Sequence, residues 1–158
     1  DIPNFPNYKL NKKTNQIYSK YKNNYMKTQL DRYGYVVITL CNEIKRRPYG
    51  LHRIVYSAHN PTEDISLLQI DHIDNNKSNS NIDNLRTATR SQNQMNIKVH
   101  TRNKLGHKNI RKFQNGYRVD IVLNGKQYNK CIKTLEEAII WRDNKQKELF
   151  GEFANSGK

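Results

Sequence analysis

The stretch that most constrains this chain runs from residue 69 to residue 96 and reads QIDHIDNNKSNSNIDNLRTATRSQNQMN. Residues 67–71 have the pattern of a short strand, and residues 85–88 have the pattern of a second one. Between them lies a long loop rich in Asn and Ser. Residues 89–92 have the spacing of a capping box, which predicts a helix from Thr89 to about Lys98. The stretch therefore predicts the order strand, long loop, strand, helix.

The polar residues of this stretch suit the hydrolysis of a phosphodiester. That reaction needs a base for the water, a cation for the developing charge and a rigid frame. Imidazole is a natural base near neutral pH, and a hard cation such as Mg²⁺ prefers oxygen ligands. Asp71, His72 and Asn93 supply these groups. Because neighbours on a regular strand point to opposite faces, Asp71 and His72 act together only if the strand bends there.

The charge balance points to a polyanionic partner. Among 158 residues there are 28 Lys and Arg against 14 Asp and Glu, a formal net charge of +14, and only 35% are hydrophobic. Such a chain gains affinity for polyanions by neutralising phosphates and releasing counterions, and it has little material for a large core. Charge alone leaves DNA, RNA, an acidic membrane surface and a merely solvated basic surface open.

Other features exclude several classes. Cys41 and Cys131 stand far apart, so neither a disulfide framework nor a four-cysteine zinc site is expected, and a reducing compartment is the default. No apolar run approaches the length of about 18 residues that a membrane span needs. The chain starts at Asp1 without a Met, which suggests a missing upstream piece, and no apolar signal-peptide segment is visible.

The remaining elements predict an α+β fold. A small N-terminal β module is expected over residues 1–50, with its best strand at 33–41, followed by a helix over 51–59 that Asn60-Pro61 ends. After a basic linker at 99–107, a three-stranded antiparallel sheet packed on one helix is expected. Its strands are predicted at 108–113, 117–123 and 126–132, with turns at Asn115-Gly116 and Asn124-Gly125 and a capped helix over 134–150.

Several fixed spacings then agree with one known family. The segment DHIDNNKSNSNIDNLRTATRSQN matches the pattern D-H-x-D-G-N-x-x-N-x-x-x-x-N-L-R…N, and HRIVYSAHNP matches H-R-L-V-A-x-x-F-x-P. The chain resembles the HNH (ββα-metal, or His-Me finger) nucleases, and most closely the phage intron-encoded HNH homing endonucleases. The likeness spans roughly residues 4–97. It implies a nuclease domain over 51–98 and a DNA-binding role for the module at 1–50.

The resemblance implies a role for each motif residue. His72 is expected to be the general base and Asp71 the carboxylate ligand of one Mg²⁺ or Mn²⁺ ion. Asn84 is expected to orient the base and its loop, and Asn93 to be the second metal ligand. Asn75 stands where the family has Gly, and Asn tolerates a left-handed backbone better than most residues.

The C-terminal segment has a likeness of its own. Residues 108–158 resemble the ethylene-response-factor (ERF-type) DNA-binding domain, which also occurs attached to phage HNH enzymes. Its G-x-W-x-A-x-I core is echoed by Gly116, Tyr117, Val119 and Ile121, with Tyr117 in place of Trp. The start of its helix is intact at residues 134–138. The likeness implies a sheet that reads the major groove, with the following residues as DNA contacts or their neighbours: Arg111, Lys112, Arg118, Lys126, Tyr128 and Lys130.

Some residues carry two interpretations. Asp74 is either a third metal ligand or, as favoured, a turn residue. Arg86 contacts a phosphate near the scissile bond or has no specific role. His52 is expected to be structural, and Trp141 to belong to the core.

The sequence therefore predicts a metal-dependent, site-specific endonuclease that acts on double-stranded DNA. One motif per chain predicts one active site, and hence a monomer that nicks. The expected setting is the cytoplasm of a phage-infected bacterium. The first alternative is a DNA-binding protein that kept the HNH frame without its chemistry, but His72, Asp71 and Asn93 are all present. An RNA-binding protein has the charge but no reason for the motif.

Overall fold

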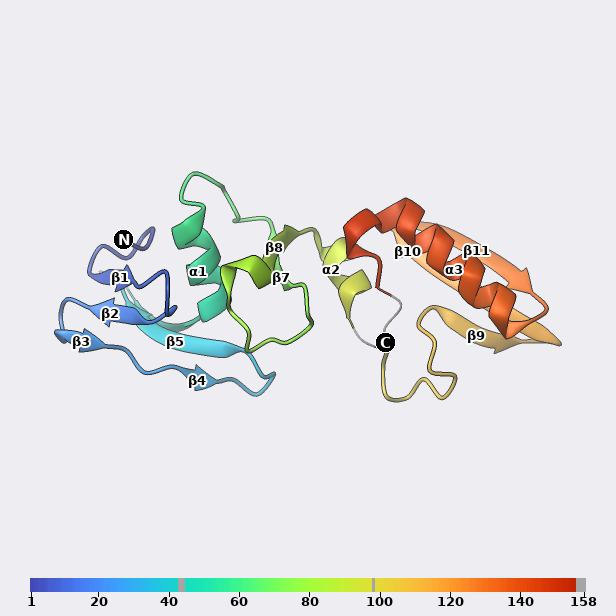
Figure 1. Cartoon of the computed structure of the whole chain (residues 1–158), viewed down its shortest axis with the longest axis horizontal. Helices are drawn as coiled ribbons and strands as arrows, with labels where there is room; N and C mark the ends of the chain where they lie inside the picture. The colour runs from blue at the N-terminus through green and yellow to red at the C-terminus, as the bar shows by residue number, and fades with distance from the viewer. Residues whose placement is uncertain (43–44, 98, 156–158) are drawn as a thin grey trace. The chain divides into compact units, whose positions relative to one another are not determined.

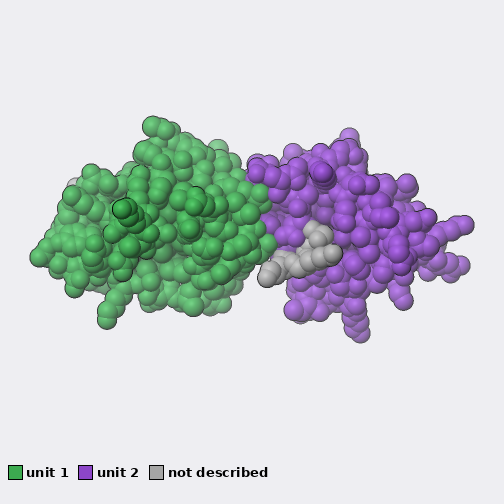
Figure 2. Space-filling view, in the orientation of Figure 1, with its two compact units in different colours: residues 1–87 green, residues 88–158 purple. Residues whose placement is uncertain are grey.

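The computed structural model describes residues 1–42, 45–97 and 99–155. The chain forms two compact units, residues 1–87 and residues 88–158 (Figure 2). Both units mix small sheets with helices (Figure 1), so the fold is α+β as the sequence predicts. Within the described residues, no helix combines the length and the apolar character needed to cross a bilayer.

The first unit contains two three-stranded sheets, a helix and a two-stranded ribbon. In the first sheet the strands follow in the order β1-β2-β3, and in the second in the order β4-β5-β6. The ribbon pairs β7 with β8, and the 3₁₀ turn η1 directly precedes β8. The elements are β1 (Tyr8–Leu10), β2 (Ile17–Ser19), β3 (Asn24–Tyr25), β4 (Gln29–Leu30), β5 (Val36–Cys41), β6 (Arg46–Gly50), α1 (Leu51–His59), β7 (Gln69–His72), η1 (Ile82–Asn84) and β8 (Leu85–Ala88).

Helix α1 has the predicted bounds and joins the N-terminal strands to the ribbon through one core. It buries Leu51, Ile54, Val55 and Ala58, which lie at helical spacing on one face. The same core takes Ile38 and Leu40 from β5, Ile70 from β7 and Leu85 from β8. The ribbon is therefore held against a packed support rather than projecting as an isolated hairpin.

The second unit is built from the short helix α2 and a helix-backed sheet. The sheet has the order β11-β10-β9, and all its pairings are antiparallel. Its core joins Val119 and Ile121 of β10 to Ala138 and Phe150 of α3. The elements are α2 (Arg90–Asn96), β9 (Ile110–Phe113), β10 (Gly116–Leu123), β11 (Lys126–Ile132), α3 (Leu135–Phe150) and the 3₁₀ turn η2 (Gly151–Phe153).

One of the two predicted hairpin turns is correct, and the other is displaced by one residue. Asn124 and Gly125 both have positive φ, at 50° and 80°, and join β10 to β11 as a two-residue turn. In the first hairpin Gly116 pairs with Phe113, so the turn is Gln114-Asn115 rather than Asn115-Gly116. Gly116 is needed for space, because a Cβ there would lie 2.5 Å from the carbonyl oxygen of Ile132.

The N-terminal strands differ from the prediction in two ways. Strand β5 begins at Val36 rather than residue 33, because the residues before it form a turn in which the Asp31 carboxylate accepts from the backbone amides of Tyr33 and Tyr35. Strands β3, β4 and β6 were not predicted. They are short or polar, and β6 contains Pro48, which an edge strand tolerates.

The predicted capping box at the start of α2 is present. The Thr89 hydroxyl accepts a hydrogen bond from the Gln92 amide, and the Gln92 side chain accepts one from the Thr89 amide at 2.8 Å. Helix α2 ends at Asn96, and Lys98, its expected end, lies outside the described residues. At α3 the Thr134 hydroxyl accepts from the amide of Glu137.

Replacing the cap of α2 should destabilise the second unit. Helix α2 has only seven residues, so the capping box is a large part of what fixes its first turn. We expect Thr89→Ala to cost about 1 kcal/mol and to lower the melting temperature of this unit by about 4–8 °C. Differential scanning calorimetry measures the shift, with the exposed linker variant Thr101→Ala as the control. An unchanged transition in Thr89→Ala would show that the cap does not limit stability.

Candidate active site

Strand β7 ends in two buried polar residues, Asp71 and His72, with exposed fractions of 4% and 5%. The chain turns immediately after them. The Asn75 amide donates to the His72 carbonyl at 2.9 Å, and Asn75 has the left-handed φ of 59° that the Gly-to-Asn comparison anticipated. The strand therefore changes direction at the Asp-His pair, where the sequence required a bend.

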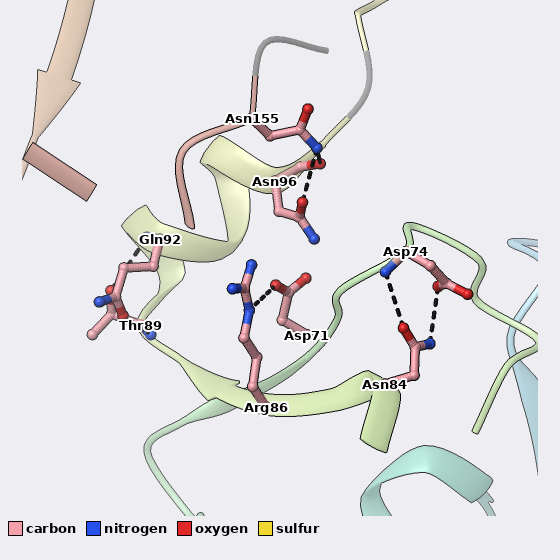
Figure 3. Close-up of polar contacts among 8 residues, drawn as sticks. All are labelled: Asp71, Asp74, Asn84, Arg86, Thr89, Gln92, Asn96 and Asn155. Atoms are coloured by element: carbon pink, nitrogen blue, oxygen red, sulfur yellow. Dashed lines mark hydrogen bonds and ion pairs between the residues drawn. The ribbon is translucent and has the colours of Figure 1, made fainter. Parts of the chain in front are cut away.

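Asn84 closes the long loop that follows His72 (Figure 3). Its Nδ2 donates to Asp74 Oδ1 at 2.9 Å and to the carbonyl of Asn79 at 3.0 Å, and its Oδ1 accepts from the Asp74 amide at 3.0 Å. Its own carbonyl accepts from the amide of Ile73 at 2.9 Å. The side chain and backbone of Asn84 thus both hold the segment that begins next to His72.

Asp74 is occupied as a turn residue. Besides Asn84, its carboxylate accepts from the Asn76 amide at 2.7 Å and from Asn79 Nδ2 at 2.8 Å. Partial burial favours a higher pKa for Asp74, but hydrogen bonds from Asn79, Asn76 and Asn84 outweigh it and hold the pKa below its ordinary value. These contacts support the interpretation of Asp74 as a loop residue rather than as a metal ligand.

Asp71 is paired with Arg86 of β8. Arg86 Nε lies 3.0 Å from Asp71 Oδ2, and both side chains are largely buried, with exposed fractions of 14% and 4% (Figure 3). A buried carboxylate is costly unless a cation or hydrogen bonds compensate its charge. Arg86, for which the sequence left a phosphate contact or no role, thus provides positive charge beside Asp71.

His72 lies among aromatic rings that the sequence did not connect with it. The centroid of its ring is 4.9 Å from that of His52 on α1 and 5.9 Å from that of Tyr35. Burial lowers the pKa of His72 below its usual value of 6.5, and Lys77 acts in the same direction. Asp74 and Asp71 oppose the shift without reversing it. The imidazole is therefore neutral at physiological pH, as a proton acceptor must be.

Asn93 belongs to the second unit. It lies in the first turn and a half of α2, and its backbone amide donates to the carbonyl of the cap residue Thr89 at 3.0 Å. The first unit therefore brings together Asp71, His72, Asn84 and Arg86, while Asn93 is held on a capped helix that directly follows β8 in the chain.

The donor chemistry of the predicted metal site fits a hard divalent cation. Among the described residues, no group of three or more His, Cys, Asp and Glu side chains is placed to hold a metal ion. The predicted ligands, Asp71 and Asn93, offer a carboxylate and a carboxamide oxygen. Mg²⁺ is held by few protein oxygens and keeps positions for water and phosphate, so this set suits it.

The predicted DNA-contacting residues occupy both faces of the C-terminal sheet. Val119 and Ile121 of β10 face α3, so Arg118 and Asp120 face away from it. The register places Arg111 opposite Arg118, hence on the same outer face. The other predicted contacts pair with residues that face the helix: Lys112 with Tyr117, Lys126 with Leu123, Tyr128 with Ile121 and Lys130 with Val119.

Contacts with α3 agree with this division. Tyr128 is partly buried against the core, and Lys145 Nζ lies 5.1 Å from the centroid of its ring. Lys130 Nζ lies 5.9 Å from the ring centroid of Trp141, which packs against the same core as expected. These side chains are engaged with the helix.

On the outer face, Asp120 joins the two arginines. Its carboxylate oxygens lie 3.0 Å from Arg111 Nε and 2.8 Å from Arg118 Nε. Partial burial favours a higher pKa for Asp120, but hydrogen bonds from Arg118 and Arg111 hold the pKa below its ordinary value. The guanidinium groups also lie 5.8 Å and 5.7 Å from the ring centroid of Phe113. Phe113 and Asp120 thus hold the two arginines together on the outer face of the sheet.

Three residues next to His72 were missed as site residues. Nothing in their sequence spacing connects Tyr35, His52 and Lys77, which come from three different segments. His52 had been assigned only a structural role. The aromatic residue before a β strand and the histidine at the start of a helix become neighbours of His72 only through the tertiary packing of α1 and β5.

The region of the chain that contains these residues matches a known protein family. A sequence family described as HNH endonuclease matches residues 49–95, which span α1, both strands of the ribbon and most of α2. An uncharacterized HNH endonuclease (L560) of Acanthamoeba polyphaga mimivirus is 39% identical over 109 residues, which are 68% of this chain and 57% of that protein. Protein 3.8 of Escherichia phage T7 is 37% identical over 87 residues, 54% of this chain and 72% of that protein.

A second mimivirus protein, uncharacterized HNH endonuclease L245, is 30% identical over 120 residues, which are 75% of this chain and 35% of that protein. The chain thus spans little more than half of one mimivirus relative and about a third of the other. Asp71 and His72 lie within the residues that the HNH endonuclease family matches. The chain belongs to the HNH endonuclease family.

A solved structure supports the fold. The HNH homing endonuclease I-HmuI, whose structure describes DNA binding and cleavage, matches with a TM-score of 0.54 over 89% of this chain and 80% of that chain. The sequence identity is 24%, so this likeness concerns the fold.

Burial of His52 should make the stability of the metal-free protein depend on pH. Burial is the main cause that lowers the pKa of His52 from 6.5 to about 4, and the neighbouring His72 adds to it. The unfolded chain therefore binds a proton near pH 6.5 that the folded chain binds only near pH 4. The contribution of His52 to the free energy of unfolding is therefore fully present above pH 6.5. It falls by about 2–3 kcal/mol as the pH drops toward 4.

Urea unfolding in EDTA between pH 4 and 7 measures this effect. We expect His52→Phe, which cannot titrate, to show a flatter pH dependence, and the exposed linker variant His100→Gln to follow the wild-type curve. Equal slopes in wild-type and His52→Phe would contradict the assigned titration.

Proposed function

We propose that the protein is a metal-dependent endonuclease that hydrolyses one strand of double-stranded DNA. The observation that carries the proposal is the buried Asp71-His72 pair at a bend closed by Asn84. HNH nucleases generally depend on a divalent metal, and this chain keeps the oxygen donors that such an ion needs. Family membership, the basic charge and the fold of a homing endonuclease support DNA as the substrate.

His72 acts as the general base in this proposal. Its neutral imidazole accepts a proton from the attacking water, and Asn84 keeps the following segment from moving away. Because the reaction needs the base within hydrogen-bond reach of the water, a fixed ring position matters as much as the pKa.

Asp71 and Asn93 are the proposed ligands of one Mg²⁺ or Mn²⁺ ion. When bound, the ion supplies positive charge for the scissile phosphate and the leaving oxygen. Asp71 is held by its ion pair with Arg86, so its carboxylate is oriented before any ion arrives. Arg86 adds a second positive charge close to the site where phosphate charge develops.

The outer face of the C-terminal sheet is the proposed reader of DNA sequence. A β sheet can enter the major groove, where an arginine binds the O6 and N7 acceptors of guanine. Arg111 and Arg118 carry this proposal, because Asp120 aligns both guanidinium groups on one face. The ERF-type likeness supports the same role. Lys112, Lys126, Tyr128 and Lys130 have less support as base contacts, because they face α3.

The N-terminal module offers a basic groove for the DNA backbone. A groove of about 490 Å³ is lined by residues of β3, β4, β5 and β6, among them Tyr25 and Arg46, and by Lys22 and Lys27, which flank β3. Among the described residues, its lining includes three cations and no acidic side chain. Such a groove suits phosphates, which position a protein on DNA without reading its sequence.

We further propose that the protein works as a monomer with one site, and that it acts inside a phage-infected bacterium as part of a mobile intron. The similar protein 3.8 of Escherichia phage T7 supports the phage setting. An HNH-derived DNA-binding protein without chemistry is the second candidate. Retention of His72, Asp71 and Asn93 favours the nuclease.

Loss of the base should abolish cleavage but not binding. We expect His72→Ala to reduce the cleavage rate about 10²–10⁴-fold, because a general base contributes roughly that factor. Supercoiled plasmid carrying the target should become nicked rather than linear with Mg²⁺, and should stay intact in EDTA. Gel shift in EDTA should show unchanged affinity, and His59→Ala serves as the control. Normal cutting by His72→Ala would contradict the assignment of His72 as the base. Cutting in EDTA would contradict the proposed dependence on a metal ion.

The two proposed DNA surfaces should respond differently to mutation. We expect Arg111→Ala to lose about 1–3 kcal/mol of discrimination between target and non-target DNA. Arg46→Ala should instead weaken binding to all sequences and reduce the slope of log affinity against log salt by about one. Fluorescence anisotropy across a salt series measures both, with the exposed α3 variant Lys147→Ala as the charge-matched control. If both variants lost affinity equally on every sequence, the proposal that the sheet recognises DNA sequence would be wrong.

A further inference from the structure

Three aromatic rings from distant segments meet around the proposed base. The ring centroid of His52 lies 5.3 Å from that of Tyr35 and 4.9 Å from that of His72, and the Tyr35 and His72 centroids are 5.9 Å apart. All three residues belong to the first unit. His52 sits on α1, which is anchored by its own buried face, so its ring has a firm support.

Gly50 leaves the space that this arrangement needs. Its φ of −63° and ψ of 126° are open to any residue, so the backbone does not require glycine there. A Cβ on Gly50, however, would lie 2.6 Å from Cε1 of His52. The ring of His52 thus occupies the volume that a side chain at position 50 would fill.

The polar atoms of His52 do not explain its position. Its Nδ1 is buried, and no hydrogen-bond partner for that atom is found within the described parts of the chain. Its pKa of about 4 keeps the ring uncharged beside His72. What the side chain offers to its neighbour is therefore a flat, neutral surface rather than a proton or a hydrogen bond.

Lys77 contacts the Tyr35 ring of this cluster. Its Nζ lies 4.8 Å from the ring centroid of Tyr35 and donates to the carbonyl of Tyr33 at 3.2 Å. Because Lys77 is part of the loop that follows His72, this contact ties the loop to the start of β5.

We propose that His52 is a positioning residue whose ring, packed with Tyr35 in the space left by Gly50, fixes the orientation of the His72 imidazole. The inference rests on the proposed role of His72 as the base. Proton transfer is sensitive to small displacements of the reacting groups, and a misplacement of 1 Å can cost about 100-fold in rate. A ring wall on one side of His72 restricts its side-chain rotation without changing its chemistry.

Single-turnover cleavage of DNA already bound to the full chain tests this inference. We expect His52→Ala to slow cleavage about 10–100-fold with unchanged DNA affinity, because the wall is lost while the binding surfaces remain. His52→Phe keeps a ring and should stay within about threefold of wild type. Gly50→Ala, which pushes the ring of His52 aside, should slow cleavage as His52→Ala does.

Thermal unfolding of each variant separates positioning from folding. Rates are measured well below the lowest melting temperature, so a merely destabilised variant would cut at the wild-type rate. Tyr35→Ala removes the other ring that packs beside His72 and should slow cleavage to a smaller extent than His52→Ala. The inference is overturned if folded His52→Ala cuts bound DNA normally, or if folded His52→Phe is as slow as His52→Ala.

His72→Ala distinguishes these failures from a failure of the proposed function. If His72→Ala is inactive while His52→Ala is fully active, the base assignment stands and the positioning role is wrong. If His72→Ala cuts normally, the proposed function itself fails.

Discussion

The closure of the long loop by Asn84 is the interaction on which the site depends. A loop of this length costs entropy to close, and its polar residues would otherwise leave the end of β7 without a fixed direction. Asn84 meets the backbone and side chain of Asp74 with both ends of its carboxamide, while its carbonyl holds the amide of Ile73. Asp71 and His72 are thereby presented at a defined bend instead of at the start of a mobile segment.

The electrostatics of the site follow from burying one acid and one imidazole side by side. The buried carboxylate of Asp71 is compensated by the guanidinium of Arg86. The same ion pair restrains the carboxylate, so a bound cation would meet an oriented donor. His72 is held neutral by burial, against the pull of the two nearby carboxylates. Asp71 and Arg86 thus form a pair of opposite charges, and the neighbouring His72 is neutral.

Local signals in the sequence were enough to predict the scaffold of the site. The apolar stripe gave α1 its bounds at 51–59, and the capping box gave α2 its start at Thr89, because both depend on residues close in the chain. The polar strand β6 was missed because its position is set by pairing with β5 rather than by its own composition. For the same reason the contact of Tyr35 and His52 with His72 was missed, since it arises only when β5, α1 and β7 share a core.

The C-terminal sheet shows what a pairing register adds to a list of basic residues. Lys126, Tyr128 and Lys130 alternate along β11, and their register opposite Leu123, Ile121 and Val119 turns them toward α3. Arg111 and Arg118 come from different strands, yet they meet on the outer face because they are direct partners across β9 and β10. Asp120, the single acid among the basic residues of these strands, thus has a structural role that the composition did not suggest. It offsets the repulsion between two neighbouring guanidinium groups, so Arg111 and Arg118 can lie side by side on the outer face.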